Sequence, residues 1–556
     1  MNRLYLYISN YLITLRRKFS LVDLYWVLIF SLFLSIPAAY SKEHFAKIVF
    51  LLCFLHSFSW SIVFCLLFRK HYMRVIIFLL LMFLFTIEIF CSFKLCARFS
   101  SNTMLLILQT NSEEIHTFFT NYIWNWETFI FIFLFLTLCL LTSYLGKKLS
   151  KLTIKISKFL FTIIILFFIS GLSLPYLNIP IHRWENSVLN CIKSGAFIID
   201  RKNEFLHIRE MYKGIKITSS PDKNNAPIIT LILGESFNKH YSNLYGYSQN
   251  TNPRLLEWKN AGNLILFENA WTPTSATNYA MKYIFTHKEC IPNEKQDSCQ
   301  YILFPMVLKK SGYKVAYFDN QYEKHGGLDY EGNYFLSPSD ISEASFDLRS
   351  EKIYKYDEDF IDAYKNKFFR DSKSFNIIHL YGQHCMPRFP QEFEKFKGSD
   401  IQTDSIEENE KELIADYLNS TLYNDHVVNK IIESMRDYNS VIVYVSDHGE
   451  GVYNGNGVTY GRKLDNCTDL NRRRNVHEIP LMIWCSDKYK ENNMEVFERI
   501  KASRFRVSCL ADIPFLLYEL ACIDFNYNKP SKSIINPYFV PHEIYLNESV
   551  IVPVNP

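Results

Sequence analysis

Long apolar runs in the first third of the chain limit its possible folds more than any other feature. Five such runs precede residue 180, and each approaches or exceeds the roughly 20 residues that an α-helix needs to cross a bilayer. A cleavable signal peptide accounts for only one run of this kind, so the pattern predicts an integral membrane protein with five transmembrane helices. The runs cover Leu21–Ala39, Ile48–Phe68, Val75–Cys96, Phe129–Leu145 and Phe159–Leu174.

Lysine and arginine gather in alternate loops between these runs. They occur at Arg16–Lys18 before the first run, at Arg69–Arg74 after the second and at Lys147–Lys155 after the fourth. The positive-inside rule places such loops in the cytoplasm. We therefore expect the N-terminus inside and everything after Leu174 outside.

Composition divides the chain into three regions. Residues 1–177 form the predicted transmembrane domain, residues 178–226 a bridging or interfacial segment along the membrane surface, and residues 227–556 a polar exported domain. A chain of 556 residues is too long for a single core. Its net charge of +4 is small for that length, so nothing indicates a nucleic-acid partner.

The exported region alternates short apolar runs with longer amphipathic or charged stretches. This alternation predicts an α/β domain with a mainly parallel sheet covered by helices on both faces. The predicted strands are Ile228–Leu233, Leu264–Phe267, Lys314–Phe318, Asn376–Leu380, Ser440–Val445 and Leu481–Trp484. The predicted helices are Tyr279–Phe285, Ile302–Ser311, Asp357–Asn366, Asp416–Arg436 and Cys509–Ala521.

Two of the predicted strands end abruptly in polar side chains. Glu235 follows the run Ile228–Leu233 after one glycine, and Asp447, His448 and Glu450 follow the run that ends at Val445. Carboxylate and imidazole groups side by side at a strand end suit Zn²⁺. An aspartate at such a position can instead cap the next helix. Because Glu235 ends an equivalent strand in the same manner, a metal site is the stronger interpretation.

Histidines lie at the ends of two neighbouring predicted strands. His379 ends one strand, His384 follows in the next loop, and His477 precedes another strand. A single histidine is more often a hydrogen-bonding residue than a ligand. Two loop histidines on opposite flanks of the Asp447–His448 strand favour a shared site.

Four hydroxyl side chains precede the predicted helix that ends at Phe285. They are Thr272, Thr274, Ser275 and Thr277. The N-terminus of a helix favours a bound phosphate, and a hydroxyl next to a metal ion becomes a better nucleophile. The simpler alternative is N-capping by Ser275 or Thr277, which is compatible with catalysis.

Eight of the thirteen cysteines fall in the region expected to be exported, where disulfides persist. Cys290 and Cys299 flank a short polar loop, and they are the pair that we expect to form a bridge. The connectivity of the other six stays open.

Both strand-end motifs resemble those of bacterial phosphoethanolamine transferases in the alkaline phosphatase and sulfatase superfamily. The second motif is Ser446–Glu450, and five spans before an exported domain match the architecture of that family. The first motif comprises Gly234–Ser236, His240, Leu244–Tyr247, Thr251, Pro253 and Leu255.

The resemblance implies roles for individual residues. Glu235, Asp447, His448 and Thr277 match the zinc ligands of the family, and Thr277 matches its threonine nucleophile, with Thr274 as the alternative.

Further residues match less directly. His384, His477 and Glu450 match residues that bind substrate phosphate or a second metal. Thr110 and Glu114 lie where relatives contact the lipid substrate, although Thr110 can equally cap a helix.

The resemblance also implies a reaction. Phosphoethanolamine would pass from phosphatidylethanolamine through a phosphothreonine to lipid A or to the core of lipopolysaccharide or lipooligosaccharide. The enzyme would be a monomer of the bacterial inner membrane with its catalytic domain in the periplasm. The stretch after Glu450 lacks the Glu-Asn-Gly run common in lipid A modifying members, so the acceptor stays open.

Two other functions fit parts of the pattern. A phosphoglycerol transferase of the lipoteichoic acid synthase type shares the spans, the fold and the threonine chemistry. A membrane sensor or scaffold without catalysis would bind no metal and would tolerate substitution at Glu235. A transporter is disfavoured, because Glu88 is almost the only ionisable residue within the spans.

Overall fold

The structure is a computed structural model of the chain, and it separates into two compact units, Met1–Arg201 and Lys202–Pro556. Each unit is described by itself. Helix α9 (Ser187–Gly214) contains the boundary between them. The residues described are 19–39, 46–94, 126–152, 156–174, 187–222, 226–291, 296–321, 334–384, 388–401, 406–453, 461–462, 470–546 and 550–552.

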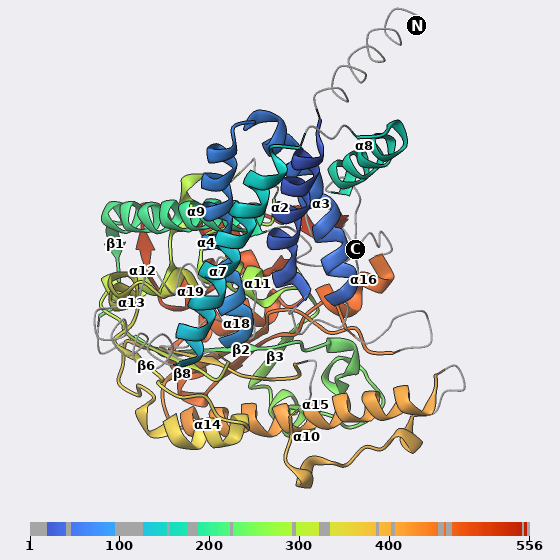
Figure 1. The fold of residues 1–556 in the computed structure, drawn as a ribbon. Coiled ribbons are helices and arrows are strands. Elements are labelled where there is room, and N and C mark those ends of the chain that lie inside the picture. The colour runs from blue at the N-terminus through green and yellow to red at the C-terminus, as the bar shows by residue number, and fades with distance from the viewer. Residues whose placement is uncertain are drawn as a thin grey trace, which may run out of the picture. The chain divides into compact units, whose positions relative to one another are not determined.

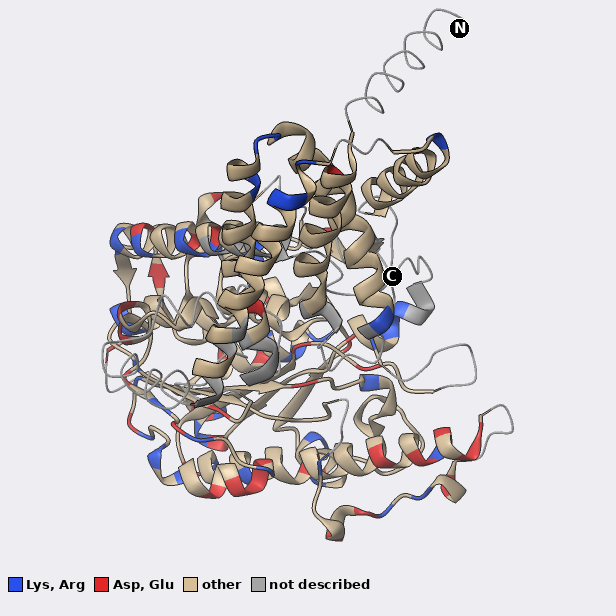
Figure 2. Ribbon diagram, viewed as in Figure 1, with Lys and Arg blue, Asp and Glu red and all other residues tan. Residues whose placement is uncertain are grey.

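The first unit is helical, and its helices coincide with the five apolar runs. They carry few charged residues (Figure 2). Trp26, Phe30 and Phe78 are fully buried among them. The helices are α2 (Leu21–Ala39), α3 (Ala46–Leu67), α4 (His71–Lys94), α7 (Trp126–Leu149) and α8 (Lys158–Ser173).

Two segments of these helices are long and apolar enough to cross a membrane. They are Lys47–Leu67 and His71–Ile89. The apolar segments Leu21–Ile36 and Lys158–Ser173 are shorter. The described residues therefore support two spans and do not confirm the predicted number of five.

The second unit is built on a seven-stranded sheet in the order β3-β9-β8-β2-β7-β5-β6. Neighbouring strands from β8 to β6 are parallel, whereas β9 runs antiparallel to both β8 and β3. The predicted parallel sheet is thus confirmed at its centre, and the sheet as a whole is mixed. The strands are β2 (Ile228–Gly234), β3 (Leu264–Phe267), β5 (Lys314–Asp319), β6 (Leu348–Arg349), β7 (Ser374–His379), β8 (Ser440–Ser446) and β9 (Leu481–Cys485).

Helices cover both faces of this sheet (Figure 1). The central strand β2 is buried along its whole length, so its side chains need a packing partner on each face. Alternate side chains of a strand point to opposite faces. Ile229 and Leu231 pack into one apolar cluster, and Ile228 and Ile232 pack into another. The first cluster is formed with α11 (Thr277–Phe285), α12 (Phe304–Lys310) and α19 (Ile513–Leu520). The second is formed with α10 (Pro253–Asn260), α14 (Asp357–Tyr364) and α15 (Glu408–Met435).

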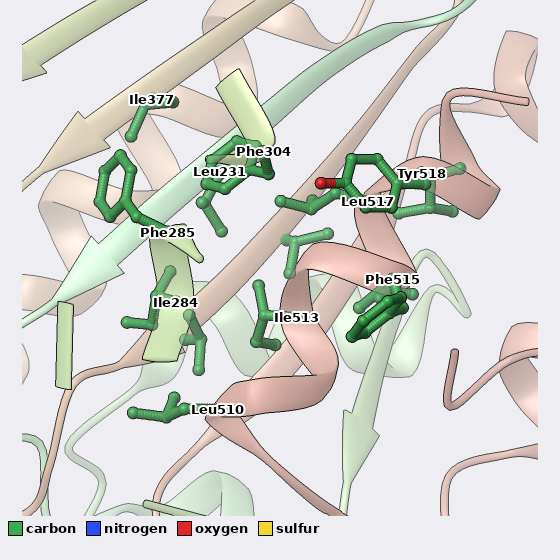
Figure 3. Packing of buried hydrophobic residues seen from close by; sticks show 14 of the residues in the cluster. Leu231, Ile284, Phe285, Phe304, Ile377, Leu510, Ile513, Phe515, Leu517 and Tyr518 are labelled. Atoms are coloured by element: carbon green, nitrogen blue, oxygen red, sulfur yellow. The ribbon is translucent and has the colours of Figure 1, made fainter. Parts of the chain in front are cut away.

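The first of these clusters fixes the helix that begins at Thr277. Figure 3 shows part of it, with Leu231 of β2, Phe285 of α11 and Phe515 of α19. Burying an apolar side chain of this size contributes about 1.5–3 kcal/mol. The position of α11 against the sheet is therefore determined by packing on its C-terminal half.

The predicted bridge between Cys290 and Cys299 is absent from the structure, in which both are free thiols. Cys290 is buried, and its thiol contacts Cys509. Cys299 lies half-buried in the short helix η6 (Ser298–Tyr301). The sequence spacing suggested a local pair, whereas the fold turns Cys290 towards a segment far along the chain.

A buried histidine beside α19 makes the stability of this unit dependent on pH. His287 packs against Phe515, Tyr518 and Phe525, and its Nε2 lies 2.9 Å from the Tyr518 hydroxyl. Burial, reinforced by the charge of Lys529, lowers the pKa of His287 to about 3. In the unfolded chain the pKa returns to about 6.5.

We expect acid to unfold the protein partly through this group. Below pH 6.5 the unfolded chain takes up a proton that the folded chain does not, so the free energy of unfolding falls as the pH falls towards 3. The slope from one such group approaches about 1.4 kcal/mol per pH unit. His287→Gln should flatten the profile in urea unfolding between pH 6.5 and 4. His207→Gln, at an exposed histidine, is the control, and an equal change in both variants would contradict the assignment.

Candidate active site

The ends of β2 and β8 bring the polar motifs together. Gly234 and Ser446 are in register on these adjacent parallel strands. The backbone N–H of Asp447 donates to Gly234 O at 3.1 Å. Glu235 and Asp447 therefore leave the same edge of the sheet side by side, as the sequence predicted.

The turn after β2 is held in an unusual conformation. Ser236 has a φ of +57°, its N–H donates to Asp447 Oδ1 at 3.0 Å, and its hydroxyl donates to Glu235 Oε1 at 2.7 Å. Gly382, in the loop after β7, also has a φ of +57°, and a Cβ there would lie 2.8 Å from Glu235 O. The backbone of Glu235 is thus enclosed so closely that only glycine fits at position 382.

Three fully buried side chains form a potential metal site. One ligand atom each from Glu235, Asp447 and His448 lies within 4.8 Å of the others. His448 Nδ1 lies 2.9 Å from Gly449 O, to which it can donate, and this leaves Nε2 facing the carboxylates. Asp447 Oδ2 accepts no hydrogen bond from the described residues. Two carboxylates and an imidazole nitrogen arranged in this way fit Zn²⁺.

The charges of this group require a positive partner. Burial would lower the pKa of His448, but the carboxylates of Asp447 and Glu235 raise it. Burial would raise the pKa of Asp447, but the charge of His448 together with hydrogen bonds from His448 and the Ser236 N–H lowers it to about 2. A protonated imidazole or a bound cation would supply that charge, and the guanidinium of Arg462, 3.9 Å from Glu235 Oε1, adds to it.

The hydroxyl of Thr277 reaches this group. Thr277 is the first residue of α11, and its Oγ1 donates to Glu235 Oε2 at 3.1 Å and lies 3.2 Å from His448 Nε2. The residue before it, Ala276, makes no side-chain cap, so neither Ser275 nor Thr277 is the N-cap of α11.

The alternative nucleophile, Thr274, has a different contact. Its Oγ1 accepts the Ala276 N–H at 3.3 Å. The described hydrogen bonds of Thr274 therefore stabilise the approach to α11 rather than joining the ligand group.

Three of the other predicted site residues, His384, Glu450 and His477, lie near the three ligands. Burial lowers the pKa of His477 to about 4, and its Nε2 has no hydrogen-bond partner among the described residues. Burial also lowers the pKa of His384, although the charge of Glu235 acts to raise it. Burial raises the pKa of Glu450 to about 7. Thr110 and Glu114 lie outside the described residues.

Two polar residues at this site were not predicted from the sequence. Arg462 Nη1 lies 2.6 Å from His448 Nε2 and donates to Ser275 O at 3.3 Å, and its Nε is 3.5 Å from Glu450. Gln321 Nε2 donates to Glu235 Oε2 at 3.1 Å. The only signals were an arginine twelve positions after Glu450 and an amide two residues beyond the end of β5.

A buried ion pair lies next to the site at the ends of β5 and β7. His379 Nδ1 is 3.0 Å from Asp319 Oδ1, and the two residues are in register. The Tyr317 hydroxyl donates to the same carboxylate at 2.6 Å. Burial would lower the pKa of His379, but the carboxylate of Asp319 raises it.

Curated phosphoethanolamine transferases are among the proteins to which the chain is similar. The chain is 29% identical over 328 residues to the phosphoethanolamine transferase EptC of Escherichia coli, covering 57% of this chain and 54% of that protein. It is 25% identical over 295 residues to the Kdo(2)-lipid A phosphoethanolamine 7''-transferase of Escherichia coli, covering 51% and 49%. The chain thus spans about half the length of the curated relatives it matches.

A solved structure shares the fold of the second unit. The C-terminal periplasmic domain of Escherichia coli EptC, crystallised as a complex with Zn, is 25% identical. Its TM-score is 0.50, and the match covers 61% of this chain and 95% of that chain. The Sulfatase family model matches residues 227–507, which include Glu235, Thr277, Asp447 and His448. The matched residues make up just over half of the chain, and the chain therefore belongs to the sulfatase family.

Proposed function

We propose that this protein transfers phosphoethanolamine from phosphatidylethanolamine to a glycolipid or glycan of the cell envelope. The observation that carries the proposal is the Thr277 hydroxyl, which lies 3.1 Å from Glu235 and 3.2 Å from His448 at the start of a helix. The curated relatives are named as phosphoethanolamine transferases, one of them acting on lipid A. Lipid A and the core of lipopolysaccharide or lipooligosaccharide are therefore the proposed acceptors.

The donor set of the site supports a zinc enzyme. Glu235, Asp447, His448 and Thr277 would hold the ion, and the related domain from Escherichia coli was crystallised with Zn. When bound, Zn²⁺ would lower the pKa of the threonine hydroxyl and would neutralise charge on the phosphate oxygens.

The side chains of the protein account for the first half of the reaction. Thr277 Oγ1 forms a bond to the phosphorus of the donor, and the bond from phosphorus to the diacylglycerol oxygen breaks. The Thr277 hydroxyl gives its proton to Glu235 Oε2 along their hydrogen bond, and the departing diacylglycerol oxygen takes up a proton from water. The first N–H groups of α11 favour the negative charge that grows on the phosphate.

The second half regenerates the enzyme. A hydroxyl or phosphate oxygen of the acceptor attacks the phosphothreonine, the bond to Thr277 Oγ1 breaks, and that oxygen recovers a proton. The acceptor loses its own proton, for which the buried Nε2 of His477 is a suitable base when its imidazole is neutral. His384, Glu450 and Arg462 would position the phosphate.

The proposal includes a location. We infer five spans within residues 1–177, a bridging segment at residues 178–226 and a periplasmic catalytic domain at residues 227–556. The two long apolar segments and the periplasmic location of the related Escherichia coli domain support this arrangement. Thr110 and Glu114 would contact the lipid head group from outside the membrane, and we propose that the enzyme acts as a monomer.

Covalent labelling tests the donor directly. Full-length protein in detergent is incubated with phosphatidylethanolamine or, separately, with phosphatidylglycerol, and the peptide that contains Thr277 is analysed by mass spectrometry. We expect the mass of phosphoethanolamine to be added on Thr277 with the first lipid only. Addition of phosphoglycerol from the second lipid would establish the phosphoglycerol transferase instead. No label from either lipid, in protein shown to contain no metal, would favour a sensor or scaffold.

A further inference from the structure

A second group of metal-binding side chains lies apart from the residues of the Thr277 site. One ligand atom each from Cys509, Asp512 and His542 lies within 4.8 Å of the others. His542 Nε2 is 2.8 Å from Asp512 Oδ1. The exposed fractions of Cys509 and Asp512 are 3% and 1%, so water cannot solvate the thiol or the carboxylate.

A fourth potential donor, from another part of the chain, lies beside Cys509. The thiol of Cys290 is within hydrogen-bonding contact of the Cys509 thiol, and Cys509 also contacts His542. Cys290 is 1% exposed, and its carbonyl accepts the Tyr545 N–H at 3.2 Å. The Cys290 thiol therefore adjoins the cluster of Cys509, Asp512 and His542, in which the thiol and the carboxylate are buried and the imidazole is partly exposed.

Backbone hydrogen bonds hold these donors in place. The Cys509 N–H donates to Asp512 Oδ2 at 2.8 Å, and the Asp512 N–H donates to Cys509 Sγ. His542 Nδ1 lies 3.3 Å from Glu543 O, to which it can donate. Asp512 Oδ1, His542 Nε2 and Cys509 Sγ are thus left facing one another. Such outer contacts, which fix the orientation and tautomer of each ligand, are typical of metal sites.

Neither an ion pair, a disulfide nor a catalytic thiol accounts for the whole cluster. A buried ion pair involves Asp512 and His542 but leaves the two thiols without a role. A disulfide between Cys290 and Cys509 would use the thiols, but both are free in the structure. A catalytic cysteine must be reached by substrate, and the 3% exposure of Cys509 prevents that.

We propose that Cys290, Cys509, Asp512 and His542 bind a structural Zn²⁺. Thiolate and imidazole ligands select zinc over the hard cations Mg²⁺ and Ca²⁺, and four protein ligands without an open position characterise structural sites. The donors come from the loop after α11, from the end of β10 (Val507–Cys509) with the adjoining turn η11 (Leu510–Asp512), and from the segment before β12 (Ile544–Leu546). The ion would therefore join three segments that are distant in sequence.

The proposed ion would stabilise the surroundings of α11. Helix α11 packs against both η11 and α19, so a metal that fixes η11 also supports the helix that begins at Thr277. A ligand that binds only the folded chain stabilises it by mass action, and the stabilisation grows with the excess of ligand over Kd. This inference does not depend on the reaction that Thr277 performs.

Thiol chemistry separates this site from the Thr277 site, whose proposed ligands include no cysteine. Full-length protein is equilibrated with Zn²⁺, freed of excess metal and treated with a mercurial, and the zinc released is measured with a chromogenic chelator. We expect one equivalent per chain to be released when the thiols are blocked. Substitution with Co²⁺ should add a thiolate-to-metal charge-transfer band, which the mercurial abolishes.

Single substitutions test which side chains hold the zinc that the mercurial releases. Cys509→Ser and His542→Ala should each remove the zinc released by mercurial, and His542 is only partly buried, so its variant is the one expected to fold. Cys299→Ser is the matched control, because that cysteine is outside the cluster and should leave the release unchanged. Release of no zinc from the unmodified protein, or recovery of a peptide pair joined by a Cys290–Cys509 disulfide, would overturn the proposal.

Discussion

Replacing Thr277 with alanine should abolish phosphoethanolamine transfer while the protein remains folded. The substitution removes the oxygen that forms the bond to phosphorus, and loss of a nucleophile of this kind lowers the rate by about 10⁴-fold or more. Alanine is compatible with the first turn of α11, and Thr277 is only half-buried, so we expect little change in stability. The measurement is the release of diacylglycerol from labelled phosphatidylethanolamine, together with thermal unfolding.

Two variants make this result specific. Thr277→Ser keeps a hydroxyl at the same place and should retain measurable transfer. Thr274→Ala removes the neighbouring hydroxyl, which bonds to Ala276, and should leave most of the activity. If Thr274→Ala were inactive and Thr277→Ala active, the nucleophile would be Thr274, and full activity in both would end the proposed mechanism.

The side chains of the proposed metal site could be brought together from the sequence because their positions depend on local patterns. A short β-branched run is typical of a buried strand, and the first polar residues after it lie at an edge of the sheet. Glu235 and Asp447 both follow this rule, and the structure brings them together in register. Thr277 was instead matched to the nucleophile of the family through the resemblance, by its spacing to the apolar residues Met281–Phe285.

Features that depend on distant pairing were not predictable in this way. The antiparallel direction of β9 is not encoded in the apolar run Leu481–Cys485, because a short run fits either direction. Cys290 was paired with the nearest cysteine, whereas the fold places it beside Cys509. Arg462 reaches the site although the composition of the sequence around it gives no sign of that position. In each case the deciding contact joins segments that are far apart in the sequence.

Substituting Asp447 with asparagine should remove the metal ion of the Thr277 site without disturbing the fold around it. Asp447 Oδ1 accepts hydrogen bonds from the N–H groups of Ser236 and His448, and an amide oxygen can accept both. Only the Oδ2 position, which accepts no hydrogen bond from the described residues, loses its charge. We expect zinc affinity to fall by about 10²-fold or more, since even the loss of an outer contact costs about 10-fold to 100-fold.

The two proposed metal sites can be separated by combining this variant with the mercurial assay. Asp447→Asn should lose the zinc that resists mercurial, lose transfer activity, and keep the equivalent held by Cys509. Glu450→Gln is the matched control, because Glu450 is also a buried carboxylate but lies outside the group of three ligands. It should retain both equivalents. If Glu450→Gln lost the same ion, Glu450 would be a ligand of that ion. If Asp447→Asn bound zinc normally, the ion would not be bound between Glu235 and His448.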